Sequence, residues 1–295
     1  MTWTLPPELS DIVLDHLHDD PVTLSRCALV QKSWLPAARY HLWSHLRLNC
    51  ASDELTKLHV LLTTSPAVGF YIRSVVVAQK KGETCQWYDL NLLHYTLSVL
   101  SLLPNLHTLT LDGLWFGAPK RNSLGIPFDG ESEQTVEVPP HSSEVVSASV
   151  RKLVISTCSF DNFEDVQHLC LAFPALSRLQ FDGVWWGRWA QEPSQNHRAL
   201  SDVLASAVVP KMTLRELDLG SCFSRDRAIE WLLDATPTNT VESLKLPLIG
   251  AHDTRLRELF ASMGGSLRHL EIGSPSTSHN KSSTCFDTFS VLFLC

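Results

Sequence analysis

The sequence has no basic stretch, no long apolar run and no paired-cysteine pattern. Its 24 lysines and arginines are outnumbered by 31 aspartates and glutamates and are dispersed over 295 residues. This argues against a nucleic-acid-binding protein, which normally carries a basic patch. No run approaches the roughly 20 apolar residues that a membrane-spanning helix needs. The first residues do not form a secretory leader, and none of the eight cysteines belongs to a Cys-x-x-Cys pair. We therefore expect free thiols in the cytoplasm or the nucleus.

Motifs of catalysis and cofactor binding are also missing. The sequence lacks a Gly-x-Ser-x-Gly elbow, a His-Glu-x-x-His pair, a phosphate-binding loop and a dinucleotide fingerprint. His41 and His45 have the i, i+4 spacing that can hold a metal ion on a helix, but no third ligand accompanies them. We expect no catalytic residue, metal or cofactor, and no enzymatic activity.

What is present begins with three short helices in residues 1–49. Pro6 and Pro7 open the first helix, where a missing N–H costs nothing. Its apolar stripe at helical spacing is Leu9, Ile12, Val13 and Leu17. Asp20 and Pro21 start the second helix as N-cap and first residue, and its stripe is Leu24, Cys27, Ala28 and Val30. The third spans 34–46. So small a unit has more apolar surface than it can bury, so we expect a partner to cover it.

These residues resemble an F-box, the motif that docks a protein on the Skp adaptor of a cullin–RING ubiquitin ligase. The resemblance covers about residues 3–49, with Leu-Pro-x-Glu-Leu-x-x-Ile, a spaced Leu and then Leu-Val-x-Lys-x-Trp. It implies that adaptor binding depends on Leu5, Pro6, Glu8, Leu9, Ile12, Leu24, Val30 and Trp34.

From residue 70 onward the pattern apolar-x-x-apolar-x-apolar recurs. Its copies begin at Ile72, Leu106, Val150, Leu176, Leu214, Val241 and Leu267, at irregular spacings of about 26 to 44 residues. Two copies reach a cysteine three residues later, Cys158 and Cys222, which is the form of a leucine-rich repeat. Matched positions of this kind favour buried turn packing over reactive thiols. Helical stretches are expected between the copies, at 52–62, 90–102, 162–172, 197–207, 225–234 and 254–263.

Each unit is thus a strand followed by a helix, and stacked units bury one continuous core. The sequence predicts an α/β fold: the three-helix F-box, then an irregular leucine-rich-repeat solenoid over 50–273, with parallel strands on the concave face and helices outside. Residues 118–148, rich in Ser, Glu, Gly and Pro, are expected to form a mobile loop. Residues 274–295 are expected to be an irregular tail without a recognisable capping unit.

Strand side chains alternate between faces, so the residues beside each buried triplet should line the concave face. One column is Ser74, Thr108, Lys152, Arg178, Glu216, Ser243 and His269. The next is Val76, Thr110, Val154, Gln180, Asp218, Lys245 and Glu271, and a third holds Asp112, Ser156 and Asp182. These columns contain no cluster of arginines, so recognition of phosphate groups is not expected.

Tryptophans follow two of the strands. We expect Trp115 and Trp185 to pack in the core, whereas Trp186 or Trp189 is a candidate for recognition because Trp is enriched in binding hot spots. The residues expected to bind a target protein are Thr108, Thr110, Arg178, Gln180, Glu216, Asp218, Lys245 and Trp186.

Together these features favour a substrate-recognition subunit of an SCF-type ubiquitin ligase. Its partners would be the Skp adaptor, the cullin scaffold and an unknown target protein, with no nucleic acid and no membrane. An interaction scaffold that uses the same F-box without degradation of its partner is the alternative. A hydrolase or transferase within a repeat-like α/β domain is a remote one.

Overall fold

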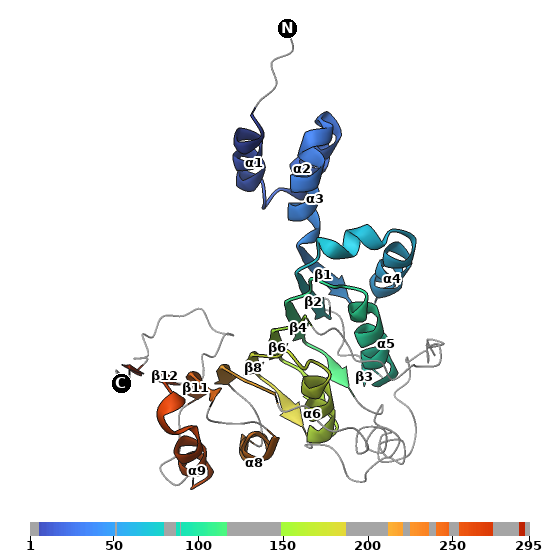
Figure 1. Cartoon of the computed structure of the whole chain (residues 1–295). Helices are drawn as coiled ribbons and strands as arrows, with labels where there is room; N and C mark the ends of the chain where they lie inside the picture. The colour runs from blue at the N-terminus through green and yellow to red at the C-terminus, as the bar shows by residue number, and fades with distance from the viewer. Residues whose placement is uncertain are drawn as a thin grey trace, which may run out of the picture.

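The computed structural model describes residues 6–50, 52–79, 87–88, 90–116, 149–186, 212–220, 225–235, 240–247, 254–273 and 289–292. It shows an α/β protein with a long, mostly parallel sheet and a lobe of three helices at the N-terminal end of that sheet (Figure 1). The expected helix at 197–207 and the insertion at 118–148 lie outside the described residues.

The N-terminal lobe consists of α1 (Pro7–His16), α2 (Pro21–Val30), the short 3-10 turn η1 (Lys32–Trp34) and α3 (Leu35–Trp43). The Asp20 carboxylate accepts a hydrogen bond from the Thr23 N–H at 3.0 Å and so caps α2 as expected. Among the described residues, three buried apolar side chains form the centre of this lobe: Leu14, Leu24 and Ala38. Leu14 is fully buried although it lies outside the stripe predicted for α1.

The sheet follows the order of the chain. Its parallel strands are β1 (His45–Asn49), β2 (Ser74–Ala78), β4 (Thr108–Asp112), β6 (Lys152–Ser156), β8 (Arg178–Asp182), β10 (Glu216–Leu219), β11 (Ser243–Pro247) and β12 (His269–Gly273). Two features were not expected. Residues 45–49 form a strand where the third helix was predicted to reach 46, and β13 (Phe289–Leu292) pairs antiparallel with β12. The tail is therefore not wholly irregular, because β13 covers the last edge of the sheet.

Helices connect the strands and cover one face of the sheet. They are α4 (Glu54–Thr64), α5 (Leu90–Ser101), α6 (Phe163–Leu171), α8 (Arg225–Ala235) and α9 (Thr254–Met263), with 3-10 turns η2 (Pro66–Phe70) and η5 (Gly264–Ser266). Their bounds lie within about two residues of the sequence expectations. Inward residues of successive strands, such as Leu109, Leu153 and Leu179, join the helices in one continuous core. A separate small sheet aligns β3 (Trp87–Tyr88), β5 (Trp115–Phe116), β7 (Ser159–Phe160) and β9 (Trp185–Trp186).

A sharp turn follows three consecutive strands of the long sheet at equivalent positions. Gly113, Thr157 and Gly183 occupy it with φ of 71°, 51° and 65°. Glycine adopts this left-handed conformation at no steric cost, which explains the repeated Asp-Gly. At Thr157 the hydroxyl donates a hydrogen bond to Asp112 Oδ1 at 3.1 Å. The turn lets the chain leave the long sheet and enter the short one.

Candidate protein-interaction surfaces

The face of the long sheet that the helices do not cover, here called the open face, carries the predicted columns in register. Thr108 pairs with Lys152, Lys152 with Arg178, and Arg178 with Glu216. The second column likewise aligns Thr110, Val154, Gln180, Asp218 and Lys245. The parallel register thus brings seven of the eight expected target-binding residues together on one surface.

Several of these residues are already paired with one another. Arg178 Nε lies 3.1 Å from Glu216 Oε1, and Lys245 Nζ lies 3.1 Å from Glu271 Oε1. The bond to Glu271 raises the pKa of Lys245. Burial raises the pKa of the Asp218 carboxyl, although Lys245 and a hydrogen bond from the Gly220 N–H at 3.1 Å oppose the shift. Exposed ion pairs contribute little to stability, so a partner can displace them at small cost.

The eighth expected target-binding residue, Trp186, does not lie on this surface. Its side chain is 3% exposed, and its ring packs 4.9 Å from that of Phe163 and 6.2 Å from that of Phe181. The equivalent residues of the neighbouring short strands, Phe116 and Phe160, are buried as well. The second residue of β5, β7 and β9 therefore points into the core, and Trp186 cannot present its ring to a target. Trp115 and Trp185, expected in the core, are only half-buried, and Trp189 lies outside the described residues.

The sequence did not lead us to expect a row of arginines at the start of the strands. The residues before the first column are Arg73, His107, Arg151, Ser177, Arg215, Glu242 and Arg268, joined by backbone hydrogen bonds such as Arg215 N–H to Ser177 O at 2.8 Å. They occupy the first variable position of each apolar-x-x-apolar pattern. The sequence expectation concerned the strand columns, which contain no cluster of arginines, and this row lies just before the strands, outside those columns.

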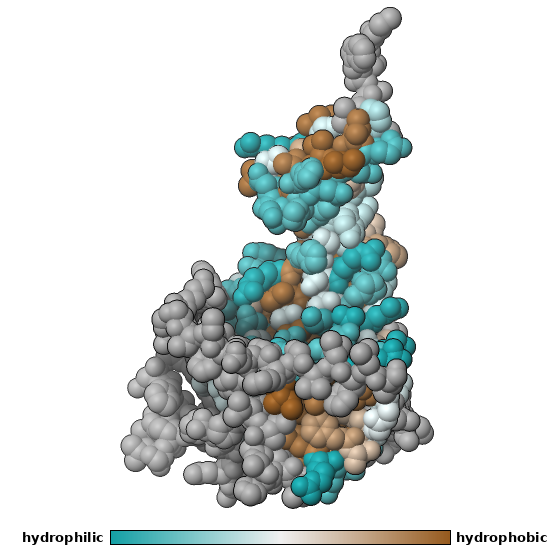
Figure 2. All heavy atoms as spheres, turned by 90° about the vertical axis from the view of Figure 1, so that its left-hand side faces the viewer, coloured by the Kyte–Doolittle hydropathy of each residue, from teal (hydrophilic) through white to brown (hydrophobic). Residues whose placement is uncertain are grey.

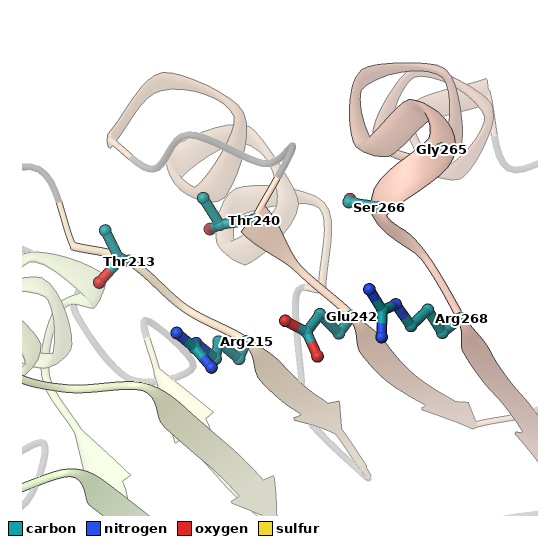
Figure 3. A pocket seen from close by; sticks show the side chains of 7 residues that line it. All are labelled: Thr213, Arg215, Thr240, Glu242, Gly265, Ser266 and Arg268. Carbon is teal, nitrogen blue, oxygen red and sulfur yellow. The ribbon is translucent and has the colours of Figure 1, made fainter.

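A groove of about 750 Å³ runs along this edge of the open face. We call it the basic groove, because its charged lining is Arg151, Lys152, Arg178, Arg215 and Arg268 against Glu216 and Glu242. Figure 3 shows a smaller pocket that shares Arg215, Glu242 and Arg268 with the groove, and there the Glu242 carboxylate lies between the guanidinium groups of the two arginines. The side chains of Arg151, Arg215 and Arg268 make no ion pair with any residue that the structure describes.

The second candidate surface lies on the N-terminal lobe. Leu9, Ile12 and Val13 on α1 are 49%, 52% and 43% exposed. Val22, Leu29 and Val30 on α2 are more exposed still, and Figure 2 shows hydrophobic side chains gathered on this upper lobe.

The residues expected to bind the adaptor do not all belong to that exposed surface. Pro6 and Glu8 are exposed and Trp34 is half-buried, whereas Leu5 lies outside the described residues. Leu24 needs correction: it is 1% exposed and packs with Leu14 and Ala38. It supports the lobe from inside and cannot touch a partner.

Other candidate groups have structural surroundings. His41 Nε2 lies 2.8 Å from Asp15 Oδ1 and ties α3 to α1. Burial raises the pKa of the Cys158 thiol to about 12, whereas Cys222 lies outside the described residues. Within the described ranges no three His, Cys, Asp or Glu side chains are grouped to hold a metal ion, and no helix there is long and apolar enough to cross a membrane. Comparison with protein-family models and with curated proteins gave no match to this chain.

Proposed function

We propose that this chain is the substrate-recognition subunit of an SCF-type ubiquitin ligase. In this proposal α1, α2 and α3 form an F-box that binds a Skp adaptor and, through it, a cullin scaffold. The strand–helix units form an irregular leucine-rich-repeat solenoid whose open face binds a target protein in the cytoplasm or the nucleus.

The observation that carries the proposal is the mismatch between the apolar surface of the lobe and its small core. Three side chains are buried at its centre, whereas Leu9, Ile12 and Val30 of the F-box pattern are about half exposed or more. Exposed apolar side chains gathered in this way are typical of a protein–protein interface. The motif and the exposed surface therefore share Leu9, Ile12 and Val30.

The arrangement of the rest of the chain supports a receptor more than an enzyme. Parallel strands follow one another in chain order, which is how repeat proteins build extended binding surfaces. The receptor itself would perform no chemistry. It would hold a target lysine near the charged conjugating enzyme and so raise its effective concentration.

Reconstitution tests the proposal directly. The full chain, mixed with recombinant Skp adaptor and cullin, should co-elute with both in size-exclusion chromatography. If the adaptor elutes separately at micromolar concentrations, the F-box assignment fails. The half-life of a captured target, with and without the chain, then separates a degradative receptor from the scaffold alternative.

A further inference from the structure

The basic groove shares the Arg178–Glu216 pair with the first column but also holds arginines that lie outside both columns, and the net charge of the whole chain does not explain it. The chain has a formal net charge of −7, yet the groove holds five cationic side chains against two carboxylates. We propose that the basic groove binds an extended acidic segment of the target protein. The inference rests on the proposed function in one respect only, namely that the protein bound in the groove is the target of the ligase.

Three of the five cations of the groove are available to a partner. Arg151, Arg215 and Arg268 are exposed, and none forms an ion pair within the described part of the chain. Arginine presents a planar fork of donors that fits a carboxylate with two parallel hydrogen bonds. Each of the three can therefore take one carboxylate without first releasing another.

Their spacing indicates the form of the segment. Arg151, Arg215 and Arg268 precede β6, β10 and β12, with one strand between each pair. Neighbouring strands lie about 4.8 Å apart, so these arginines recur about every 10 Å. A polyproline II segment rises about 3.1 Å per residue with three residues per turn, so every third side chain falls on one side at about 9 Å intervals. Acidic residues at every third position would meet successive arginines.

The same geometry argues against other anions. Arg151, Arg215 and Arg268 stand at backbone positions about 10 Å apart, a spacing that suits anionic groups distributed along a chain better than a single phosphate group. Single-stranded nucleic acid normally stacks its bases on aromatic rings, and none of the described residues that line the groove is Phe, Tyr or Trp. Carboxylates distributed along a peptide fit both observations.

Fluorescence anisotropy tests this with the full chain and a labelled peptide that carries Asp at every third position and Pro between. We expect binding that weakens as salt rises, and no binding of the peptide with Asn in place of Asp. The double change Arg215→Glu with Arg268→Glu should weaken binding at least tenfold. The matched control, Lys57→Glu with Arg255→Glu, alters net charge equally on α4 and α9 and should leave the affinity unchanged.

A second variant guards against loss of folding. Glu242→Gln removes a carboxylate from between two groove arginines, so the Asp peptide should bind several-fold more tightly. Equal binding of the Asp and Asn peptides, an unaffected Arg215/Arg268 variant, or tighter binding of a single-stranded oligonucleotide would each overturn the proposal. Adaptor binding by the same proteins is measured separately. If the wild-type chain does not bind the adaptor, the ligase proposal fails, but the result for the basic groove is unaffected.

Discussion

Leu9 and Ile12 offer the sharpest perturbation of adaptor docking. The two side chains lie on one face of α1 and are 49% and 52% exposed. Each change to alanine removes three carbons, worth about 2.4 kcal/mol when fully buried at about 0.8 kcal/mol per methylene. Because the lobe already covers half of each side chain, an adaptor can bury only the other half, about 1.2 kcal/mol per residue. The double variant should therefore bind the adaptor about 60-fold more weakly, a loss of about 2.4 kcal/mol.

Isothermal titration calorimetry with recombinant adaptor measures this loss. Val60→Ala is the matched control, because Val60 is 57% exposed on α4, outside the proposed F-box, and its truncation should not change the affinity. Leu24→Ala is the contrasting variant. Leu24 is 1% exposed, so its truncation should destabilise the lobe by about 2–5 kcal/mol and weaken binding only by unfolding the lobe.

Folding must be checked alongside affinity, because the covered halves of Leu9 and Ile12 also stabilise the lobe. Far-UV circular dichroism at the titration temperature shows whether the helices persist. If the double variant stays helical and binds the adaptor within threefold of the wild-type affinity, the exposed face of α1 is not the docking surface.

Three further predictions concern stability and thiol reactivity. Gly264 has a φ of 54° and its neighbour Gly265 has no positive φ, while an added Cβ would meet nothing within 4 Å at either. Gly264→Ala should therefore cost about 1 kcal/mol of unfolding free energy and Gly265→Ala none; equal effects in urea denaturation would contradict the assigned backbone. Burial raises the pKa of Cys158 to about 12 and also raises that of Cys170, so iodoacetamide at pH 8 should label both thiols only in denaturant. Mass spectrometry checks this, and labelling of either cysteine in the folded chain would contradict it. Burial raises the folded-state pKa of Asp218 above its unfolded value. Asp218 therefore lowers the unfolding free energy of the protein as pH rises from the unfolded pKa to the folded pKa. Asp218→Asn should then raise the melting temperature at pH 7, with a gain that disappears below the unfolded pKa; a gain independent of pH would rule out this cause.

Sequence reasoning succeeded where the pattern itself encodes geometry. The apolar-x-x-apolar-x-apolar pattern states which residues of a strand face inward, and Leu109, Leu153 and Leu179 are all buried as it predicts. Parallel pairing in chain order then fixes which outward residues become neighbours. For this reason the columns containing Thr108 and Thr110 could be written from the sequence alone.

The burial predictions were wrong where a short strand or helix could turn either of two apolar faces toward the core. A two-residue strand is too short for an alternating pattern to show which residue points inward, and in β9 the buried residue is Trp186 rather than Trp185. In α1 the apolar residues spread over a broad arc, and packing against Ala38 selected Leu14 for the core. The basic groove was not predicted for another reason: Arg151, Arg215 and Arg268 come from separate repeats and lie before the strands, outside the predicted columns.

The connection between the two surfaces bears on how a receptor of this kind would work. The described chain passes from α3 to β1 through Ser44 alone, and the Ser44 carbonyl accepts hydrogen bonds from both Arg73 and Ser74 at 3.0 and 2.9 Å. The Arg73 guanidinium also lies 5.6 Å from the centre of the Tyr40 ring, a cation–π contact between α3 and the start of β2. A ligase that acts by proximity gains most when the target is held at a fixed distance from the adaptor, because a flexible linker lowers the effective concentration of the target lysine. In the proposed receptor, a helix leading directly into the first strand of the sheet meets that requirement.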